Sequence, residues 1–225
     1  MKLIKSGKRL AEERACPTPF GVTLSEVFSA SAMDAGAVGY VLSRLPRGDA
    51  PILWVQDRLS RKEAGRPYLT GIGVERPIIM VGLTRETDVL WAMEDGLRCR
   101  GLGAVIGEIW GNPAKVDFTA TKRLAMRSEA AKVPCWLVRH AASPDLSAAR
   151  DRWRIASLPS ARHPHDARSP GAPRWSLDLF RSRGTKPGQW VASYDRTTDR
   201  LDLSAAFRDG EMAETYGAQG RRTTG

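Results

Sequence analysis

The chain alternates short, uninterrupted apolar runs with longer segments in which apolar residues recur every three or four positions. An uninterrupted apolar run is typical of a strand that is buried on both faces of a parallel sheet. The spacing of three or four positions is typical of a helix with one buried face. The runs that we interpret as strands cover residues 24–28, 50–57, 76–83, 102–111 and 133–140.

Helical spacing occurs in three segments between these strands. Asp34 is in the N-cap position of the first helix, Thr84 or Thr87 can cap the second, and Leu124 points inward in the third. The polar stretch 58–75 is predicted to be a plain connection. The alternation of strands and helices predicts an α/β domain with a mostly parallel central sheet, whose loops gather along one edge where ligands bind. The three helices are expected within residues 34–45, 84–101 and 119–132.

The pattern changes after residue 140. In residues 149–160 Trp153 and Ile155 alternate with Arg152 and Arg154, which is the period of a strand with one wet face. A Pro-rich loop follows, and residues 175–195 then alternate on both sides of a turn, as in an antiparallel hairpin. One more strand is expected near residues 197–206. We predict a basic lead-in at 1–20, one domain at 21–208 and a disordered tail at 209–225.

Positive charge concentrates in the second half of the chain. The 225 residues carry a net charge of +10, and residues 150–190 hold nine Lys or Arg against three Asp, with three Trp among them. Arg suits phosphate or carboxylate contacts and aromatic rings can stack on bases, so this region predicts binding to DNA or to an acidic partner. The alternative is a solvated sheet face with the Trp side chains in the core. The candidate binding residues are Arg150, Arg152, Arg154, Arg174, Arg181, Arg183 and Lys186.

Several classes of protein and site do not fit the sequence. The sequence has no run of 18 apolar residues, and the first residues lack the apolar block of a secretion signal, so we expect a cytoplasmic protein with no membrane contact. The three cysteines have no C-x-x-C spacing and are expected to be free thiols. His163 and His165 stand in a Pro-rich loop with no Cys nearby, so no metal site is expected.

The stretch SASAMDAG, residues 29–36, stands where a strand–loop–helix unit would bind phosphate. A phosphate loop needs glycines that let backbone N–H groups surround the anion, and a Lys that reaches the outer phosphates. This loop has no Lys, and Gly36 is its single glycine. Asp34 would repel phosphate, although Ser29 and Ser31 can donate hydrogen bonds. We therefore predict a degenerate loop, with no catalytic residue, cofactor or metal.

Two acids follow strands that run beside this loop. Asp57 ends one apolar run, and Glu108 lies near the end of another, where an NTPase would hold Mg²⁺ and position water. Without the Lys, a structural role is favoured for both, so we interpret them as relic acids.

These stretches together resemble one known family. The segments LSEVFSASAMDAGAVGYVLSRL, PILWVQD, GLGAVIGEIW and PRWSLDLFRSRGTKPGQWVASYD are similar to the ImuA family, whose members are RecA-like and related to the division inhibitor SulA. The resemblance covers roughly residues 20–205. It implies a RecA-like core with a mostly parallel sheet flanked by helices, plus a C-terminal antiparallel hairpin. Asp57 then falls near RecA's catalytic acid and Glu108 near its Walker B acid, while Ala35–Gly36 replace the Lys–Thr pair.

The resemblance also implies a role. ImuA-like proteins support error-prone translesion synthesis in the SOS response, together with ImuB, an inactive Y-family polymerase relative, and an error-prone C-family DNA polymerase. The chain is then a non-catalytic accessory protein, associated with the nucleoid when DNA is damaged, that contacts these partners and possible further ones, RecA and single-stranded DNA. Two other functions stay open: a nucleotide-dependent DNA-binding ATPase, and a cell-division inhibitor in the manner of SulA.

Overall fold

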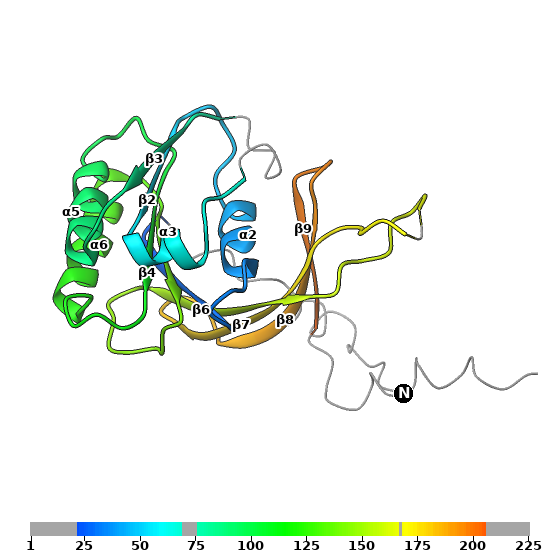
Figure 1. The fold of residues 1–225 in the computed structure, drawn as a ribbon. Helices are drawn as coiled ribbons and strands as arrows, with labels where there is room; N and C mark the ends of the chain where they lie inside the picture. Colours follow the sequence, from blue (N-terminus) through cyan, green and yellow to red (C-terminus); the bar gives the residue numbers. More distant parts are fainter. Residues whose placement is uncertain (1–21, 69–75, 167, 206–225) are drawn as a thin grey trace, which may run out of the picture.

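The computed structural model describes residues 22–68, 76–166 and 168–205, and these form one nine-stranded mixed sheet with helices against it (Figure 1). The strand order is β3-β2-β4-β5-β1-β6-β7-β8-β9. The strands are β1 (Leu24–Ser29), β2 (Ile52–Gln56), β3 (Ile78–Gly82), β4 (Ala104–Trp110), β5 (Cys135–His140), β6 (Asp151–Leu158), β7 (Arg174–Ser182), β8 (Gly188–Asp195) and β9 (Arg200–Ala205). The helices are α2 (Gly36–Ser43), α3 (Arg58–Glu63), α5 (Glu86–Gly96) and α6 (Phe118–Ala131).

The first half of the sheet is parallel and is covered on both faces. The helices α5 and α6 pack on one face, where Leu24, Val105 and Leu137 belong to the core cluster that these helices complete. The helix α2 packs on the opposite face through Tyr40 and Val41. Four of the five apolar runs of the sequence are therefore buried strands of an α/β sheet, as predicted: β1, β2, β4 and β5.

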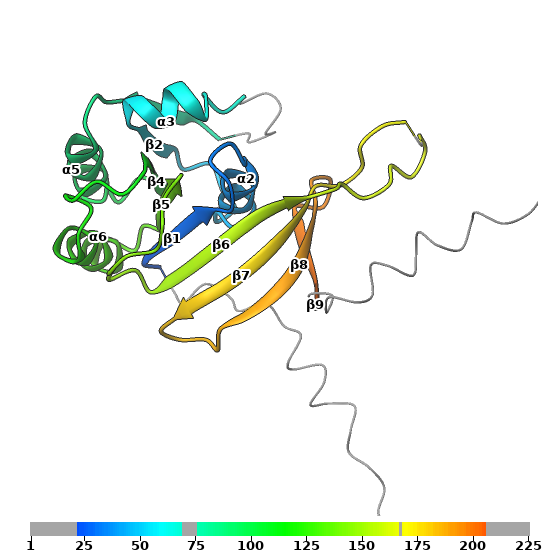
Figure 2. The ribbon, with the colours of Figure 1, turned by 60° about the horizontal axis from the view of Figure 1, so that its bottom comes forward.

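The second half of the sheet is antiparallel. The strand β6 pairs in parallel with β1 and antiparallel with β7, so it joins the two halves (Figure 2). The predicted hairpin is β7–β8, and β9 pairs with β8 as the further strand. Trp153, Trp175 and Trp190 all point into the core cluster under α2. The alternation seen in the sequence thus separates a Trp-lined inner face from an Arg-bearing outer face.

Two predictions about secondary-structure elements are wrong. The run at 76–83 is not a strand buried on both faces: β3 is the edge strand, and Ile79 and Met80 are 48% and 37% exposed. Periodicity does not show whether an apolar strand has neighbours on both sides. The polar connection at 58–75 contains a helix, α3, which Asp57 caps.

Two helix starts also differ from the prediction. The N-cap of α2 is Ala35 rather than Asp34, and that of α5 is Arg85 rather than Thr84 or Thr87. Neither of these N-cap residues makes a side-chain capping bond.

The predicted lead-in at 1–20 and tail at 209–225 lie outside the described residues, and the domain boundaries stay predictions. Within the described part of the chain, no helix is both long enough and apolar enough to cross a membrane. In the same part, no three His, Cys, Asp or Glu residues gather as a metal site would require.

Candidate functional site

The loop between β1 and α2 is held by Asp34. One carboxylate oxygen, Oδ1, accepts hydrogen bonds from the Gly36 N–H at 2.7 Å and from the Ser157 hydroxyl at 2.5 Å. The other, Oδ2, accepts the Ser157 N–H at 2.8 Å. Asp34 thereby ties the start of α2 to β6, which explains why this acid follows the strand without serving as the N-cap.

The charge of Asp34 is stabilised where a phosphate loop would hold its ligand. Partial burial acts to raise the pKa of Asp34, but the hydrogen bonds from Ser157 and Gly36 outweigh it and lower that pKa below its usual value. In a working phosphate loop the backbone N–H groups at the helix start face the anion. Here the N–H of Gly36 already donates to an internal carboxylate. Ser31 is exposed in the same loop, and its carbonyl accepts a hydrogen bond from the Asp34 N–H at 3.2 Å.

Asp57 has a structural position. Its Oδ1 accepts the Ser60 N–H at 2.6 Å as the N-cap of α3, and its Oδ2 accepts the Trp110 N–H at 3.1 Å. The residue is buried, and both oxygens are used by the backbone. Asp57 therefore joins the carboxyl ends of β2 and β4.

Glu108 lies at the centre of a buried polar network. Its Oε1 accepts hydrogen bonds from the Trp54 indole and from Gln56 Nε2, the latter at 3.1 Å. Its Oε2 lies 2.7 Å from His140 Nε2, and His140 Nδ1 lies 3.3 Å from the Ser29 hydroxyl oxygen. Carboxylate, imidazole and hydroxyl thus form one chain across three adjacent strands, β4, β5 and β1.

The sequence did not reveal this chain of side chains, although a signal exists. Ser29 and His140 each end an apolar run, and Glu108 lies near the end of another. Their contact depends on the strand order β4-β5-β1, which the sequence pattern does not specify. A buried polar residue at the carboxyl end of each of three neighbouring strands is the signal that would have found them.

A pocket of about 390 Å³ opens above this network. Its polar floor is Gln56, Glu108 and His140, and its apolar wall includes Met33, Val38 and Leu42. The Ser29 hydroxyl does not line the pocket. The N–H of Ala30 donates to Ile155 and the N–H of Gly36 donates to Asp34, so neither is free to stabilise an oxyanion. These two amides therefore do not provide the pair of free donors that acyl transfer requires.

Arg152 corrects one predicted binding residue. It is only 4% exposed, and its Nε donates to Glu26 Oε2 at 2.8 Å. Arg139 donates to the other oxygen of the same carboxylate at 3.2 Å, and both guanidinium groups lie over the ring of Phe28. Arg152 belongs to a buried ion-pair network, because this part of the outer face is covered, and its guanidinium is not offered to a ligand.

The other predicted basic residues occupy three different settings. Arg154 is exposed, pairs with Asp178 at 3.2 Å and lies over the ring of Phe180. Arg174 is half-buried at the start of β7, and Lys186 is exposed in the turn after β7. The remaining three, Arg150, Arg181 and Arg183, line one groove beside α6.

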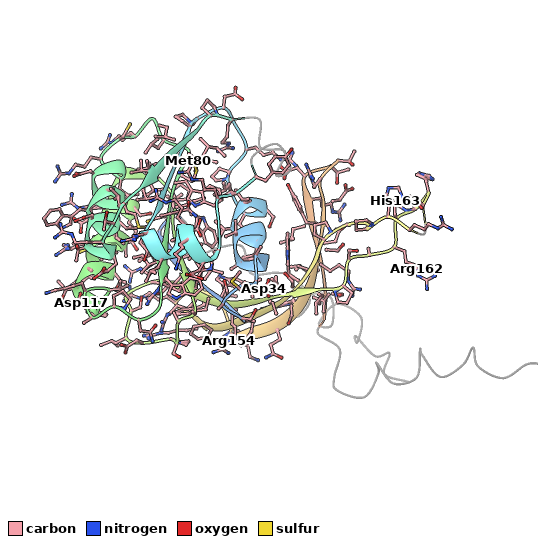
Figure 3. All side chains as sticks on the ribbon, in the orientation of Figure 1. Asp34, Met80, Asp117, Arg154, Arg162 and His163 are labelled. Carbon is pink, nitrogen blue, oxygen red and sulfur yellow. The ribbon has the colours of Figure 1, made fainter. Side chains whose placement is uncertain are left out.

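Two further predictions concern the aromatic and histidine side chains. Trp153, Trp175 and Trp190 are buried, which matches the alternative in which the Trp side chains are core residues. His163 lies with Arg162 on the loop that projects from the sheet (Figure 3). Among the described residues, no group of three or more His, Cys, Asp or Glu side chains that could hold a metal ion forms at His163 or His165.

Comparisons with known proteins support the family predicted from the sequence. Protein ImuA from Caulobacter vibrioides (strain NA1000 / CB15N) is 32% identical to the chain over 157 residues, which is 64% of the chain and 61% of that relative. This similarity supports the ImuA family for the chain. Protein ImuA from a second strain of the species, ATCC 19089 / CIP 103742 / CB 15, gives the same values. The match thus spans about three fifths of the relatives' length.

Two other comparisons add little to this assignment. No family model matches the chain. The crystal structure of SulA from Pseudomonas aeruginosa aligns with 53% of this chain and 98% of its own, at 17% identity and a TM-score of 0.39. That likeness is too low to support a fold assignment.

Proposed function

We propose that this chain is a non-catalytic accessory protein of the SOS response that supports error-prone translesion DNA synthesis. Its similarity to the ImuA family supports the link to damage-induced mutagenesis. The single structural observation that carries the non-catalytic part is the bond from the Gly36 N–H to the Asp34 carboxylate, at 2.7 Å. An internal carboxylate holds the amide that a nucleotide phosphate would need.

The fold supports the finer proposal of a RecA-like core. The phosphate-loop position follows β1, which lies between β5 and β6 in the interior of the sheet. Asp57, which resembles RecA's catalytic acid, directly follows β2. Glu108, which resembles the Walker B acid, lies near the end of β4, and both strands belong to the parallel half of the sheet. The antiparallel strands β7 and β8 extend the sheet beyond it, as the hairpin of the family resemblance implies.

The same residues support loss of nucleotide chemistry within that core. Both Asp57 oxygens accept backbone N–H groups, and both Glu108 oxygens accept or contact side-chain nitrogens. A Mg²⁺ ion would have to displace these donors, and the loop has no Lys to hold the outer phosphates. On this proposal the network stabilises the carboxyl edge of the sheet rather than a metal.

The partners follow from the family and are part of the proposal. They are an ImuB-like inactive Y-family polymerase and an error-prone C-family DNA polymerase, with RecA and single-stranded DNA as further candidates. The protein would then act in the cytoplasm and at the nucleoid after DNA damage. Its exposed basic residues provide the contact surface, and its sheet provides a rigid scaffold for it.

One observation favours a second function, a nucleotide-dependent ATPase. The pocket of about 390 Å³ lies at the carboxyl edge of the parallel strands, where α/β folds bind ligands. Its wall is mainly apolar, however, and Arg66 is the one Lys or Arg among the described residues that line it, beside the acids Asp34 and Glu108. A base or another small apolar ligand would suit it better than a triphosphate.

The proposal is tested by combining a genetic assay with a biochemical one. Deleting the gene should lower the frequency of ultraviolet-induced mutations, and the wild-type gene should restore it. The purified chain should neither bind nor hydrolyse ATP in the presence of magnesium. A clear ATPase rate that Glu108→Gln abolishes would overturn the non-catalytic assignment, and an unchanged mutation frequency in the deletion strain would overturn the SOS role.

A further inference from the structure

A groove of about 510 Å³ lies between α6 and the end of β7. In Figure 2, α6 lies at the same end of the sheet as the arrowhead of β7. One wall is the outer side of α6, the floor is the segment 147–150, and the other wall is the segment 181–183. Three elements that are far apart in the sequence therefore form one concave surface, and the pattern of the chain alone does not reveal it.

Hydrogen bonds hold the floor and the second wall in place. The Ala148 N–H donates to the Thr121 hydroxyl of α6 at 3.0 Å, and the Arg183 N–H donates to the Arg150 carbonyl at 2.9 Å. The Ser182 hydroxyl donates to Asp151 at 2.6 Å. Because backbone and buried side chains set these positions, the groove is formed before any partner arrives.

The groove carries uncompensated positive charge. Arg150 Nε pairs with Glu129 at 2.7 Å. Lys122, Arg181 and Arg183 are exposed, and none of them forms an ion pair with another residue of the described part of the chain. Three cations that line one groove attract an anionic ligand and fix its position in the groove.

The same groove has an apolar wall on α6. Phe118 is 42% exposed and Met126 is 57% exposed, and the buried Ala125 also lines the groove. Exposed apolar side chains beside cations fit a ligand that carries both carboxylates and an apolar side chain. A methionine surface also adapts its shape to different apolar groups.

A protein ligand fits these features better than single-stranded DNA does. Proteins that bind single strands usually combine a basic track with several exposed aromatic rings on which bases stack. Here Trp153, Trp175 and Trp190 are all in the core, and the groove contains one ring, that of Phe118. The groove has room for a few side chains rather than for an extended strand of nucleotides.

We propose that this groove, formed by α6, residues 147–150 and residues 181–183, docks an acidic segment of a partner protein that inserts an apolar side chain. The carboxylates of the segment pair with Lys122, Arg181 and Arg183, and its apolar side chain packs on Phe118 and Met126. This inference deepens the proposed accessory function, since it assigns the partner-binding surface and the chemistry of the partner segment.

The test is peptide binding to the full chain, measured by fluorescence anisotropy at low salt. The probe is a fluorescein-labelled dodecapeptide with four Asp or Glu and two Leu, and the control peptide has Ser in place of both Leu. The groove variant is Arg181→Glu combined with Arg183→Glu. The matched control is Arg58→Glu with Arg100→Glu, which changes the net charge equally at exposed positions outside the groove.

We expect the Leu-containing peptide to bind, and the groove variant to weaken its binding by about tenfold, because two attractive charge pairs become repulsive. The matched control should bind like the wild type, and the Ser-containing peptide should bind more weakly. Met126→Ser should lower affinity for the Leu-containing peptide alone, which separates docking from nonspecific attraction.

Three results would overturn the inference: no peptide binding, equal loss in both charge-reversal variants, or an oligo-dT of equal charge that binds more tightly and displaces the peptide. The proposed function is judged separately by the mutation-frequency assay. A lower mutation frequency in the deletion strain together with no peptide binding would reject the groove as a docking site and keep the accessory role. An unchanged mutation frequency together with peptide binding would reject the accessory role and keep the groove as a docking site.

Discussion

Replacing Glu26 with Gln should destabilise the protein severely, because this carboxylate is the anion that neutralises two buried guanidinium groups. Glu26 is 1% exposed, and its two oxygens accept from Arg139 and Arg152. Arg139 also donates to the Gly111 carbonyl and to Asn112. Arg152 donates to Glu26, and its guanidinium lies over the rings of Phe28 and Phe180. Burial already lowers the pKa of Arg139, despite the opposing effect of Glu26.

The expected loss follows from the cost of leaving a buried charge without its partner. Breaking one buried ion pair costs about 3–5 kcal/mol. For a chain of this size that corresponds to a fall in the thermal midpoint of about 6–20 °C. The assay is urea unfolding followed by circular dichroism, in which the midpoint should fall while the dependence on denaturant stays unchanged.

Glu94→Gln is the matched control. Glu94 also accepts from two arginines, Arg123 at 2.7 Å and Arg127 at 3.2 Å, but the Arg123 and Arg127 side chains are 48% and 38% exposed. Water screens such pairs, so the loss there should be at most about 1 kcal/mol. If Glu26→Gln lowers the free energy of unfolding no more than Glu94→Gln does, the electrostatic account of the buried network is wrong.

Other perturbations test the loop and the core. Asp34→Asn should destabilise the protein at pH 7, because the pKa of Asp34 is lowered by folding. The stabilisation is present above the usual Asp pKa and is lost as the pH falls through the folded value, so the two unfolding midpoints should converge as the pH falls below the usual Asp pKa of about 3.9. Gly39→Ala should cost about 1–3 kcal/mol in urea unfolding, since its Cβ would lie 2.8 Å from the Trp175 ring; a midpoint equal to that of the wild type would show that the ring moves freely. Iodoacetamide should modify exposed Cys99 quickly and buried Cys135 slowly, because burial raises the pKa of the Cys135 thiol; equal rates by mass spectrometry would contradict the packing of β5.

Much of the fold follows from the spacing of apolar residues, because that spacing reports burial on one face or on two. The alternation at Trp153 and Ile155 correctly separated the core side of β6 from its outer side. The same rule does not predict the burial of Arg152, since an outer face can be covered by segments that are distant in the sequence. The edge position of β3 was missed for a related reason. The spacing of apolar residues shows which face of a strand is buried, but it does not show how many neighbouring strands pair with it.

The candidate site was less predictable than the fold. The absence of Lys from residues 29–36 was visible in the composition, but the hydrogen bonds between Asp34 and Ser157 join residues 123 positions apart. The contact between Glu108, His140 and Ser29 depends on strand order in the same way. The groove needs α6 and the end of β7 to be neighbours, and only the assembled sheet makes them so.

The position of β1 between β5 and β6 has a consequence for synthesis of the chain. Its hydrogen-bonded neighbours come much later: Glu26 meets Arg139 after 113 residues and Arg152 after 126. At about 5–20 residues per second, those partners emerge roughly 6–25 s after β1 itself. Contacts of such long range are slow to form because the intervening chain must first be closed into a loop. During that interval β1, an apolar strand that carries Glu26, has no strand to pair with on either side. We therefore expect the growing chain to need protection from aggregation until β6 has been synthesised.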